Sequence, residues 1–187
     1  KILEEKADFG IAFDGDSDRI GVVDDTGRSI PGDKLMLTLA LDILSKTKEE
    51  NPAFVSEVKC SQLLYDTINK NGGNAIMWKT GHGYIKGKMK EENALMAGEM
   101  SGHIFFKDGY FGFDDAVYAG CRFIEIVSQK KAEDNSFKVS EFIDSFPAKF
   151  TSEEVRFPCP NEFKYGIVEE LQEELTAKPD IFNNKIN

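Results

Sequence analysis

The sequence predicts an α/β fold in which a mixed β-sheet is layered with helices. Short apolar runs of strand length alternate with longer segments in which apolar residues recur every three or four positions. The connections between them are short and rich in glycine, asparagine and aspartate. Strands that alternate with helices across short loops are typical of α/β layer structures.

The first elements are two short strands joined by an acidic loop. Ile11 to Phe13 is an apolar run that leads into the loop, and Ile20 to Val23 is its expected return partner. Asp24 to Gly27 then has the composition of a turn.

Helices and strands alternate after this turn. The helix at 33–46 has a wide apolar face and Gly32-Asp33 as its expected cap. We expect further helices at 61–70, 84–92 and 113–129, and strands at 53–58, 75–78, 95–97 and 104–106. The residues expected on the inner side of the last helix are Ala116, Val117, Gly120, Phe123, Ile124 and Val127.

The chain changes character near Ser145-Phe146-Pro147. A strand-like run at 148–157 and an acidic helix at about 161–177 follow, and they are too small to form a core of their own. The chain also begins in the middle of an element. We therefore expect it to be part of a larger protein.

The composition excludes some classes of partner. With 23 Lys and Arg against 33 Asp and Glu, the formal net charge is -10, and no basic run is present. A nucleic-acid-binding surface is therefore not expected, although a local cleft could still hold an anion. No segment approaches the roughly 18 consecutive apolar residues of a membrane span. Without a signal-peptide pattern, and with an odd number of cysteines outside any CxxC motif, we expect a cytoplasmic protein with three buried free thiols at Cys60, Cys121 and Cys159.

The acidic loop is the most informative motif of the chain. Asp14, Asp16 and Asp18 alternate along a tight turn, where carboxylates stay ionised together only if a cation lies among them. Oxygen-only ligands suit Mg²⁺, and Arg19 beside them is suited to hold a phosphate. Two alternatives remain. An EF-hand loop would need Gly where Arg19 stands and Glu where Asp25 stands, and a solvated acidic turn would bind nothing.

Two glycine-flanked loops carry both histidines of the chain. His82 follows Lys79 in the segment Trp78 to Gly83, and His103 follows Glu99 and Ser101 in the segment Gly98 to His103. At the ends of predicted strands, the acceptor, hydroxyl and imidazole of Gly98 to His103 fit a polyhydroxylated ligand, and Lys79 could reach a phosphate or sugar oxygen. A snorkelling surface lysine and ordinary polar turns are the alternatives.

Together these loops resemble those of the α-D-phosphohexomutases, most closely the bacterial phosphomannomutase/phosphoglucomutase branch. The matching segments are Asp14 to Arg19, Met77 to His82, Gly98 to His103 and Phe111 to Asp115. The resemblance implies the end of a second domain at 1–28, a complete third domain at 29–146 and the start of a C-terminal domain at 147–187. The serine loop that carries the phosphoryl group and the last phosphate-binding loop have no match. We therefore expect the chain to need missing domains and to be inactive alone.

The resemblance also implies roles for the site residues. Asp14, Asp16 and Asp18 would bind Mg²⁺, and Arg19 would lie beside the phosphoryl group. Mannose or glucose 1- and 6-phosphate would be the substrates, and the hexose would contact Lys79, His82, Glu99, Ser101 and His103, with His103 also a candidate for proton transfer. Met100 favours this branch over phosphoglucosamine mutases, which typically have Gln there. A non-catalytic sugar-phosphate or metal-binding module remains the alternative from another class.

Overall fold

A computed structural model of the chain describes residues 1–148 and 155–178, and the chain divides into two units. The first unit extends from Lys1 to Phe150 and the second from Thr151 to Asn187. Within the described residues, no helix is long and apolar enough to cross a membrane.

The centre of the first unit is a four-stranded mixed sheet. Its strand order is β5 (Asn74–Trp78), β4 (Ala53–Glu57), β6 (Met96–Gly98) and β7 (Ile104–Phe106). β4 is parallel to both β5 and β6, and β7 is antiparallel to β6. The predicted fold class is therefore confirmed. Because the three parallel strands run the same way, the loops that follow them meet at one edge, which we call the carboxyl edge.

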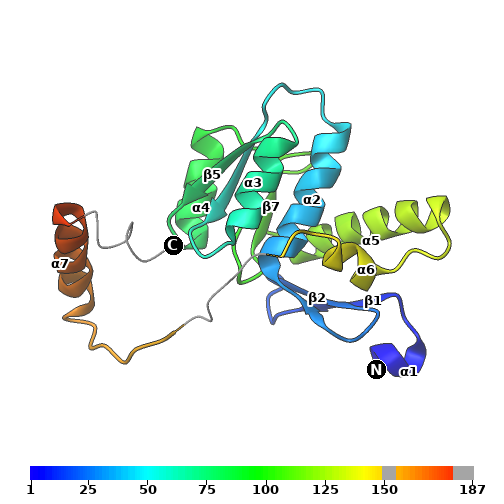
Figure 1. Ribbon diagram of the computed structural model, residues 1–187, viewed down its shortest axis with the longest axis horizontal. Helices are drawn as coiled ribbons and strands as arrows, with labels where there is room; N and C mark the ends of the chain where they lie inside the picture. The colour runs from blue at the N-terminus through cyan, green and yellow to red at the C-terminus, as the bar shows by residue number, and fades with distance from the viewer. Residues whose placement is uncertain (149–154, 179–187) are drawn as a thin grey trace. The chain divides into compact units, whose positions relative to one another are not determined.

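Helices cover both faces of this sheet (Figure 1). On one face lies α4 (His82–Glu91), whose Ile85 and Met89 pack in a small core with Val55 and Phe105. The other face carries the larger core, built with residues of α2 (Gly32–Lys46), α3 (Gln62–Lys70) and α5 (Ala116–Glu133). The sheet is thus the middle layer of the unit.

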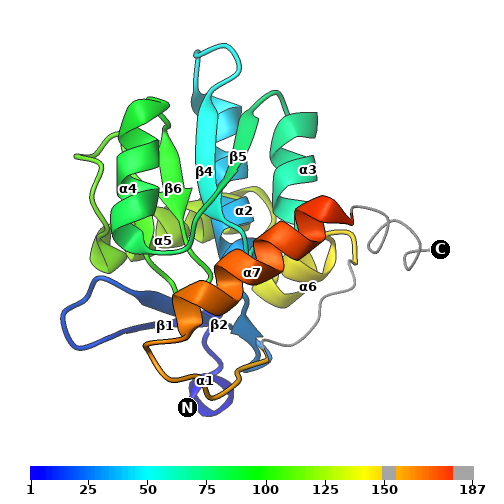
Figure 2. The ribbon, with the colours of Figure 1, turned by 90° about the vertical axis from the view of Figure 1, so that its left-hand side faces the viewer.

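A second, three-stranded antiparallel sheet follows the short helix α1 (Ile2–Glu5). It consists of β1 (Phe9–Phe13), β2 (Ile20–Asp24) and β3 (Ser29–Ile30). Figure 2 shows β1 and β2 beside one end of the four-stranded sheet. The Phe9 ring meets the Phe123 ring of α5 edge-on, with centroids 5.2 Å apart.

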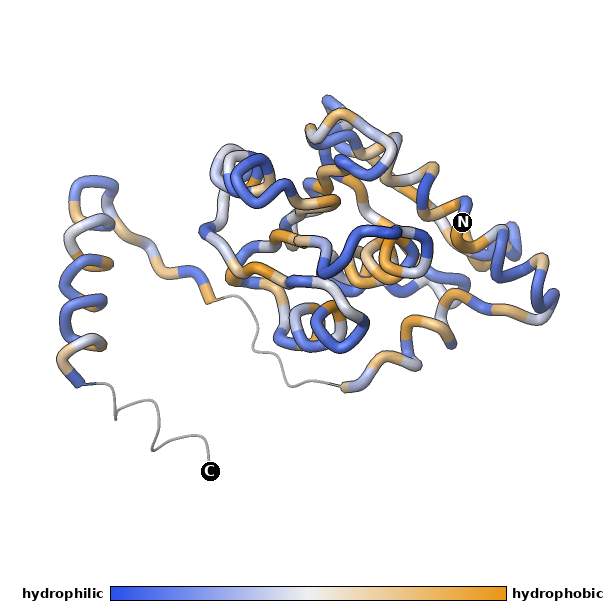
Figure 3. The backbone as a smooth tube through the Cα atoms, turned by 90° about the horizontal axis from the view of Figure 1, so that it is seen from above, coloured by the Kyte–Doolittle hydropathy of each residue, from blue (hydrophilic) through white to orange (hydrophobic). Residues whose placement is uncertain are grey.

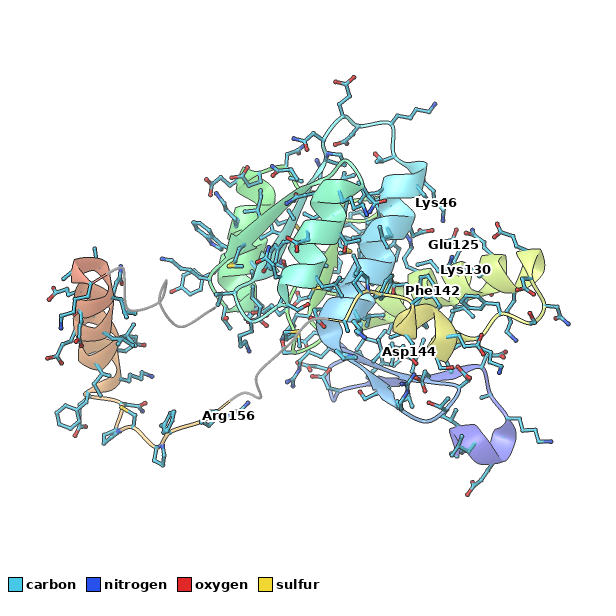
Figure 4. All side chains as sticks on the ribbon, in the orientation of Figure 1. Lys46, Glu125, Lys130, Phe142, Asp144 and Arg156 are labelled. Carbon is cyan, nitrogen blue, oxygen red and sulfur yellow. The ribbon has the colours of Figure 1, made fainter. Side chains whose placement is uncertain are left out.

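Side-chain contacts fix α6 (Val139–Asp144) to the turn between β2 and β3 and to α5. The Asp25 carboxylate accepts hydrogen bonds from the backbone N (2.7 Å) and Oγ (3.0 Å) of Ser140 in the first turn of α6. Arg28 donates to Asp144 at 2.9 Å. Figure 4 labels Asp144 together with Lys130 of α5, whose Nζ lies 4.6 Å from the ring centroid of Phe142.

The second unit contains α7 (Lys164–Ala177), along which hydrophobic and hydrophilic residues alternate (Figure 3). The predicted strand at 148–157 lies mainly outside the described residues, and 155–157 are not in a strand. The helix predicted from about residue 161 begins at Lys164.

Several details of the prediction were wrong. Helix α5 was predicted to begin at residue 113 but begins at Ala116. The Asp115 side chain accepts the Tyr118 N–H and so caps the helix there. Val117 and Ile124 are exposed, since they lie one residue (about 100°) round the helix from the buried Ala116 and Phe123.

Capping and cysteine burial were also predicted incorrectly. The cap position of α2 is Pro31 and not Gly32-Asp33, and the Asp33 carboxylate instead accepts the backbone N–H of Ser61 at 3.1 Å. Cys60 is buried, but Cys121 and Cys159 are exposed. Cys121 follows the buried Gly120 on α5, and its side chain points away from the core because it lies about 100° further round the helix.

Candidate functional site

The acidic loop at 14–19 connects β1 to β2, whose last register pair is Phe13 with Ile20. Backbone bonds close it: Ser17 N donates to Asp14 O, and Asp14 N donates to Arg19 O, both at 3.3 Å. Ser17 adopts the left-handed conformation, with φ at 61°. This tight path brings carboxylate oxygens of Asp14, Asp16 and Asp18 within 4.8 Å of one another. Because both flanking elements are strands, the helix–loop–helix frame of an EF-hand is absent here.

Arg19 organises one side of this loop. Its Nε donates to Asp14 Oδ2 at 2.6 Å, its backbone N donates to Asp14 Oδ1 at 3.2 Å, and Nε lies 3.7 Å from Asp18 Oδ1. Loss of solvent alone would raise the pKa of Asp14, but the hydrogen bonds from Arg19 outweigh this and lower it. Asp14 therefore remains a carboxylate across the physiological pH range.

The pKa of Asp18 is shifted in the opposite direction, upward. Loss of solvent raises its pKa, and the carboxylates of Asp16, Asp14 and Asp114 add to this effect while His103 opposes it. Within the described part of the chain, its Oδ1 is buried and receives no hydrogen bond. A buried carboxylate oxygen without a hydrogen bond, close to other carboxylates, is the arrangement that a hard divalent cation would relieve, so these three aspartates fit Mg²⁺.

The loops of the carboxyl edge contain the predicted sugar-binding residues. Glu99 is buried directly after β6, and its Oε1 accepts the backbone N–H of Gly81 at 2.6 Å. Its own N–H donates to the His103 carbonyl at 2.9 Å, which closes a turn with the exposed Ser101 at its tip. Lys79 is exposed after β5, with Nζ 6.0 Å from the ring centroid of Tyr84.

The acidic loop and the turn at 99–103 are in direct contact. Ile20 N donates to Gly102 O at 3.1 Å, and Arg19 forms an antiparallel bridge with His103. Gly102 has φ of +98°, and a Cβ on it would lie 2.4 Å from Ile20 O, so glycine is required for this close approach. The two predicted halves of the site are thus adjacent.

The two histidines lie at this junction. His103 Nδ1 lies 3.0 Å from Asp114 Oδ2 and 3.7 Å from Asp18 Oδ2. His82, the first residue of α4, has its Nδ1 3.9 Å from Asp114 Oδ2. The two rings stack with centroids 5.5 Å apart.

Sequence reasoning missed three residues of this region. Asp114 orients His103, and its only signal was its place in the segment Phe111 to Asp115, to which no role was given. Glu57 ends β4 fully buried, and Lys59 lies just beyond it with Nζ 3.5 Å from Glu57 Oε2. Both follow the rule that a charged residue at the end of an apolar strand is a candidate site residue. That rule was used only for Lys79.

Comparison with known proteins shows the family of the chain. Residues 31–150 match the family described as phosphoglucomutase/phosphomannomutase, alpha/beta/alpha domain III. The chain belongs to this family. Phosphomannomutase/phosphoglucomutase of Pseudomonas aeruginosa is 44% identical over 173 residues, which are 92% of this chain and 36% of that protein. Phosphoglucomutase of Neisseria gonorrhoeae is 44% identical over 166 residues, or 88% of this chain and 34% of that protein.

A solved structure gives the same result for the fold. The crystal structure of a phosphoglucomutase/phosphomannomutase family protein from Burkholderia thailandensis superposes with a TM-score of 0.73 at 37% identity, covering 81% of this chain and 31% of that chain. The chain therefore spans about a third of the length of the relatives it matches.

Proposed function

We propose that this chain provides the metal loop and the sugar-recognition loops of a phosphomannomutase/phosphoglucomutase. The enzyme would interconvert hexose 1-phosphate and hexose 6-phosphate through a phosphoserine and a bisphosphate intermediate. The proposed boundaries are the end of domain 2 at 1–28, domain 3 at 29–146 and the start of the C-terminal domain at 147–187. The phosphoserine would lie outside this chain, which would be inactive alone.

The observation that carries the proposal is the contact between Ile20 N and Gly102 O at 3.1 Å. It places the carboxylates of the acidic loop beside the turn that carries Glu99, Ser101 and His103. A site that transfers a phosphoryl group to a sugar requires such residues to converge.

Asp14, Asp16 and Asp18 would hold Mg²⁺, which neutralises charge on a transferring phosphoryl group. Arg19 would hold the same group from the side, because its Nε is fixed by Asp14 at 2.6 Å while its side chain stays half exposed. The protein's own contribution is then to position charges that match the transition state.

His103 would move the proton of the reacting hydroxyl. With Asp114 Oδ2 at 3.0 Å from Nδ1, the carboxylate favours a proton on that nitrogen. Nε2 is then the atom that can accept a proton from the sugar and return it. Glu99, Ser101, Lys79 and His82 would hold the hexose around it.

Calorimetric titration of the chain tests the binding half of the proposal. We expect weak Mg²⁺ binding that Asp16→Asn reduces by about tenfold or more, because a charged ligand is lost. The exposed Glu49→Gln is the matched control and should leave the affinity unchanged. Equal Mg²⁺ affinity in wild type and Asp16→Asn would remove the metal loop from the proposal.

The parent reading frame separates an enzyme from a non-catalytic binding module. A serine-bearing domain upstream and an arginine-containing phosphate loop downstream, with turnover of glucose or mannose 1-phosphate by that protein, are expected for the enzyme. Preference for glucosamine phosphate would instead indicate a phosphoglucosamine mutase. Turnover by the 187-residue chain alone would overturn the assignment of the nucleophile.

A further inference from the structure

We propose that Glu57 is a positioning residue that locks the two recognition loops, 79–81 and 99–103, together. The inference rests on the proposed function for its consequence in sugar binding. Its structural part, the coupling of the loops through one carboxylate, can be tested without any ligand.

Glu57 lies at the end of the central strand β4, between the strands that precede the two loops. Its side chain is fully buried. Oε2 accepts a hydrogen bond from Thr80 Oγ at 2.6 Å, and Oε1 accepts one from the backbone N–H of Met100 at 2.7 Å. One carboxylate therefore bridges two loops that are separate in the sequence.

The carboxylate of Glu99 adds a direct hydrogen bond between the two loops. Glu99, next to Met100, accepts the backbone N–H of Gly81, next to Thr80, at 2.6 Å. Each loop is thus bonded both to the other loop and to Glu57. Neither loop can shift along the sheet edge without breaking a hydrogen bond to a buried charge, which is among the stronger hydrogen bonds in proteins.

Stability alone is a weak reason for a buried carboxylate at this position. A buried ion pair often contributes less than an apolar residue of similar size, and the nearby Lys59 Nζ, at 3.5 Å, is itself partly exposed. A role in fixing Glu99 is the better explanation. Glu99 already uses Oε1 to hold Gly81, so its placement toward a sugar depends on where the neighbouring loop lies.

The main test is amide hydrogen exchange of the chain, followed by NMR. Glu57→Gln should speed exchange at Met100 by about tenfold or more, because a bond to a charged acceptor is weakened. The decisive amide is that of Gly81, which bonds to Glu99 and not to Glu57. The proposal requires it to speed up as well, and an unchanged Gly81 amide with a faster Met100 amide would overturn it.

A second variant covers the case in which Glu57→Gln fails to fold. Thr80→Val removes one donor at an exposed loop position, and it should speed exchange at Met100 in the other loop by several-fold. Thr47→Val, at the end of α2, also removes one threonine hydrogen bond and is the matched control. Identical Met100 exchange in Thr80→Val and Thr47→Val would overturn the coupling.

The consequence for ligand is tested with glucose 6-phosphate and, separately, with Mg²⁺. Glu57→Gln should weaken sugar-phosphate binding by about tenfold, as loss of a supporting residue commonly does, and leave Mg²⁺ affinity within about twofold. An equal loss for both ligands would point to general unfolding and overturn the positioning role. If the wild-type chain binds no hexose phosphate, the proposed function fails, while the exchange results still decide the coupling.

Discussion

The acidic loop and the carboxyl edge hold the same chemical group in opposite surroundings. Glu57 and Glu99 are buried, and main-chain or hydroxyl donors bond to their oxygens. Asp16 is exposed, and Asp18 has a buried Oδ1 that no described residue hydrogen-bonds. Carboxylates whose bonds are supplied by the fold fix the backbone, whereas those left short of donors are available to a cation.

Asp24 shows that the hydrogen-bond partners of a carboxylate matter more for its behaviour than the sheet to which it belongs. It belongs to the same antiparallel sheet as the acidic loop, yet it is buried and accepts hydrogen bonds from Thr26 and Arg28. Its behaviour should therefore resemble that of Glu57 and not that of Asp16.

The largest effect is expected from separating the two regions. Gly102→Ala would place a Cβ 2.4 Å from Ile20 O at a residue with φ of +98°. We expect the free energy of unfolding to fall by about 3 kcal/mol through the clash and the strained backbone, as measured by urea denaturation. Mg²⁺ and sugar-phosphate binding should both weaken, because the contact that joins the two loops is lost.

Gly87→Ala is the matched control for this glycine. Gly87 lies inside α4, and a Cβ there would meet nothing within 4 Å. The substitution should stabilise the chain by up to about 1 kcal/mol through helix propensity. A Gly102→Ala protein as stable as wild type would mean that the two regions do not depend on each other.

A smaller effect distinguishes the two kinds of carboxylate. Glu57→Ala should lower the free energy of unfolding by about 2 kcal/mol, because it leaves the Met100 N–H without its acceptor. Asp16→Ala should change it by less than about 0.5 kcal/mol, because an exposed side chain is removed. Chemical denaturation of both variants at neutral pH makes the comparison, and equal losses would contradict it.

The last effect concerns Asp24, is smaller than that of Glu57→Ala and depends on pH. Burial alone would raise the pKa of Asp24, but the hydrogen bonds from Thr26 and Arg28 outweigh it and lower the pKa below the ordinary 3.8. Its stabilisation is therefore present above that ordinary pKa and is lost as the pH falls through the lowered one. Asp24→Asn should cost about 1 kcal/mol at pH 7, and the difference from wild type should shrink below about pH 4. A difference that stays constant down to pH 2 would show that the charge of Asp24 is not responsible.

Much of the fold could be predicted because its signals are local. Apolar runs identified the four strands of the mixed sheet, and the alternation of Asp14, Asp16 and Asp18 indicated where carboxylates converge. The predicted buried face of α5 was too wide, because it included Val117 and Ile124, which are apolar but exposed. Apolar character alone does not fix which stripe of a helix faces the core.

The missed parts of the site depend on contacts between distant segments. An apolar strand that ends in Glu57 predicts burial of the strand, but not that Thr80 and Met100 will bring donors to its carboxylate. Asp114 likewise gains its role only when the chain returns beside His103. Such contacts follow from strand order, which local periodicity does not encode.

The hydrogen bond from Ile20 to Gly102 also has a consequence for the folding pathway. It joins Ile20 in β2 to Gly102 in the turn between β6 and β7, which are far apart in the sequence, and so requires closure of a long loop. We therefore expect the aspartates to reach the turn at 99–103 late in folding, after local helices and strands have formed. Partly folded chains would hold native-like helices and strands before they hold a complete site.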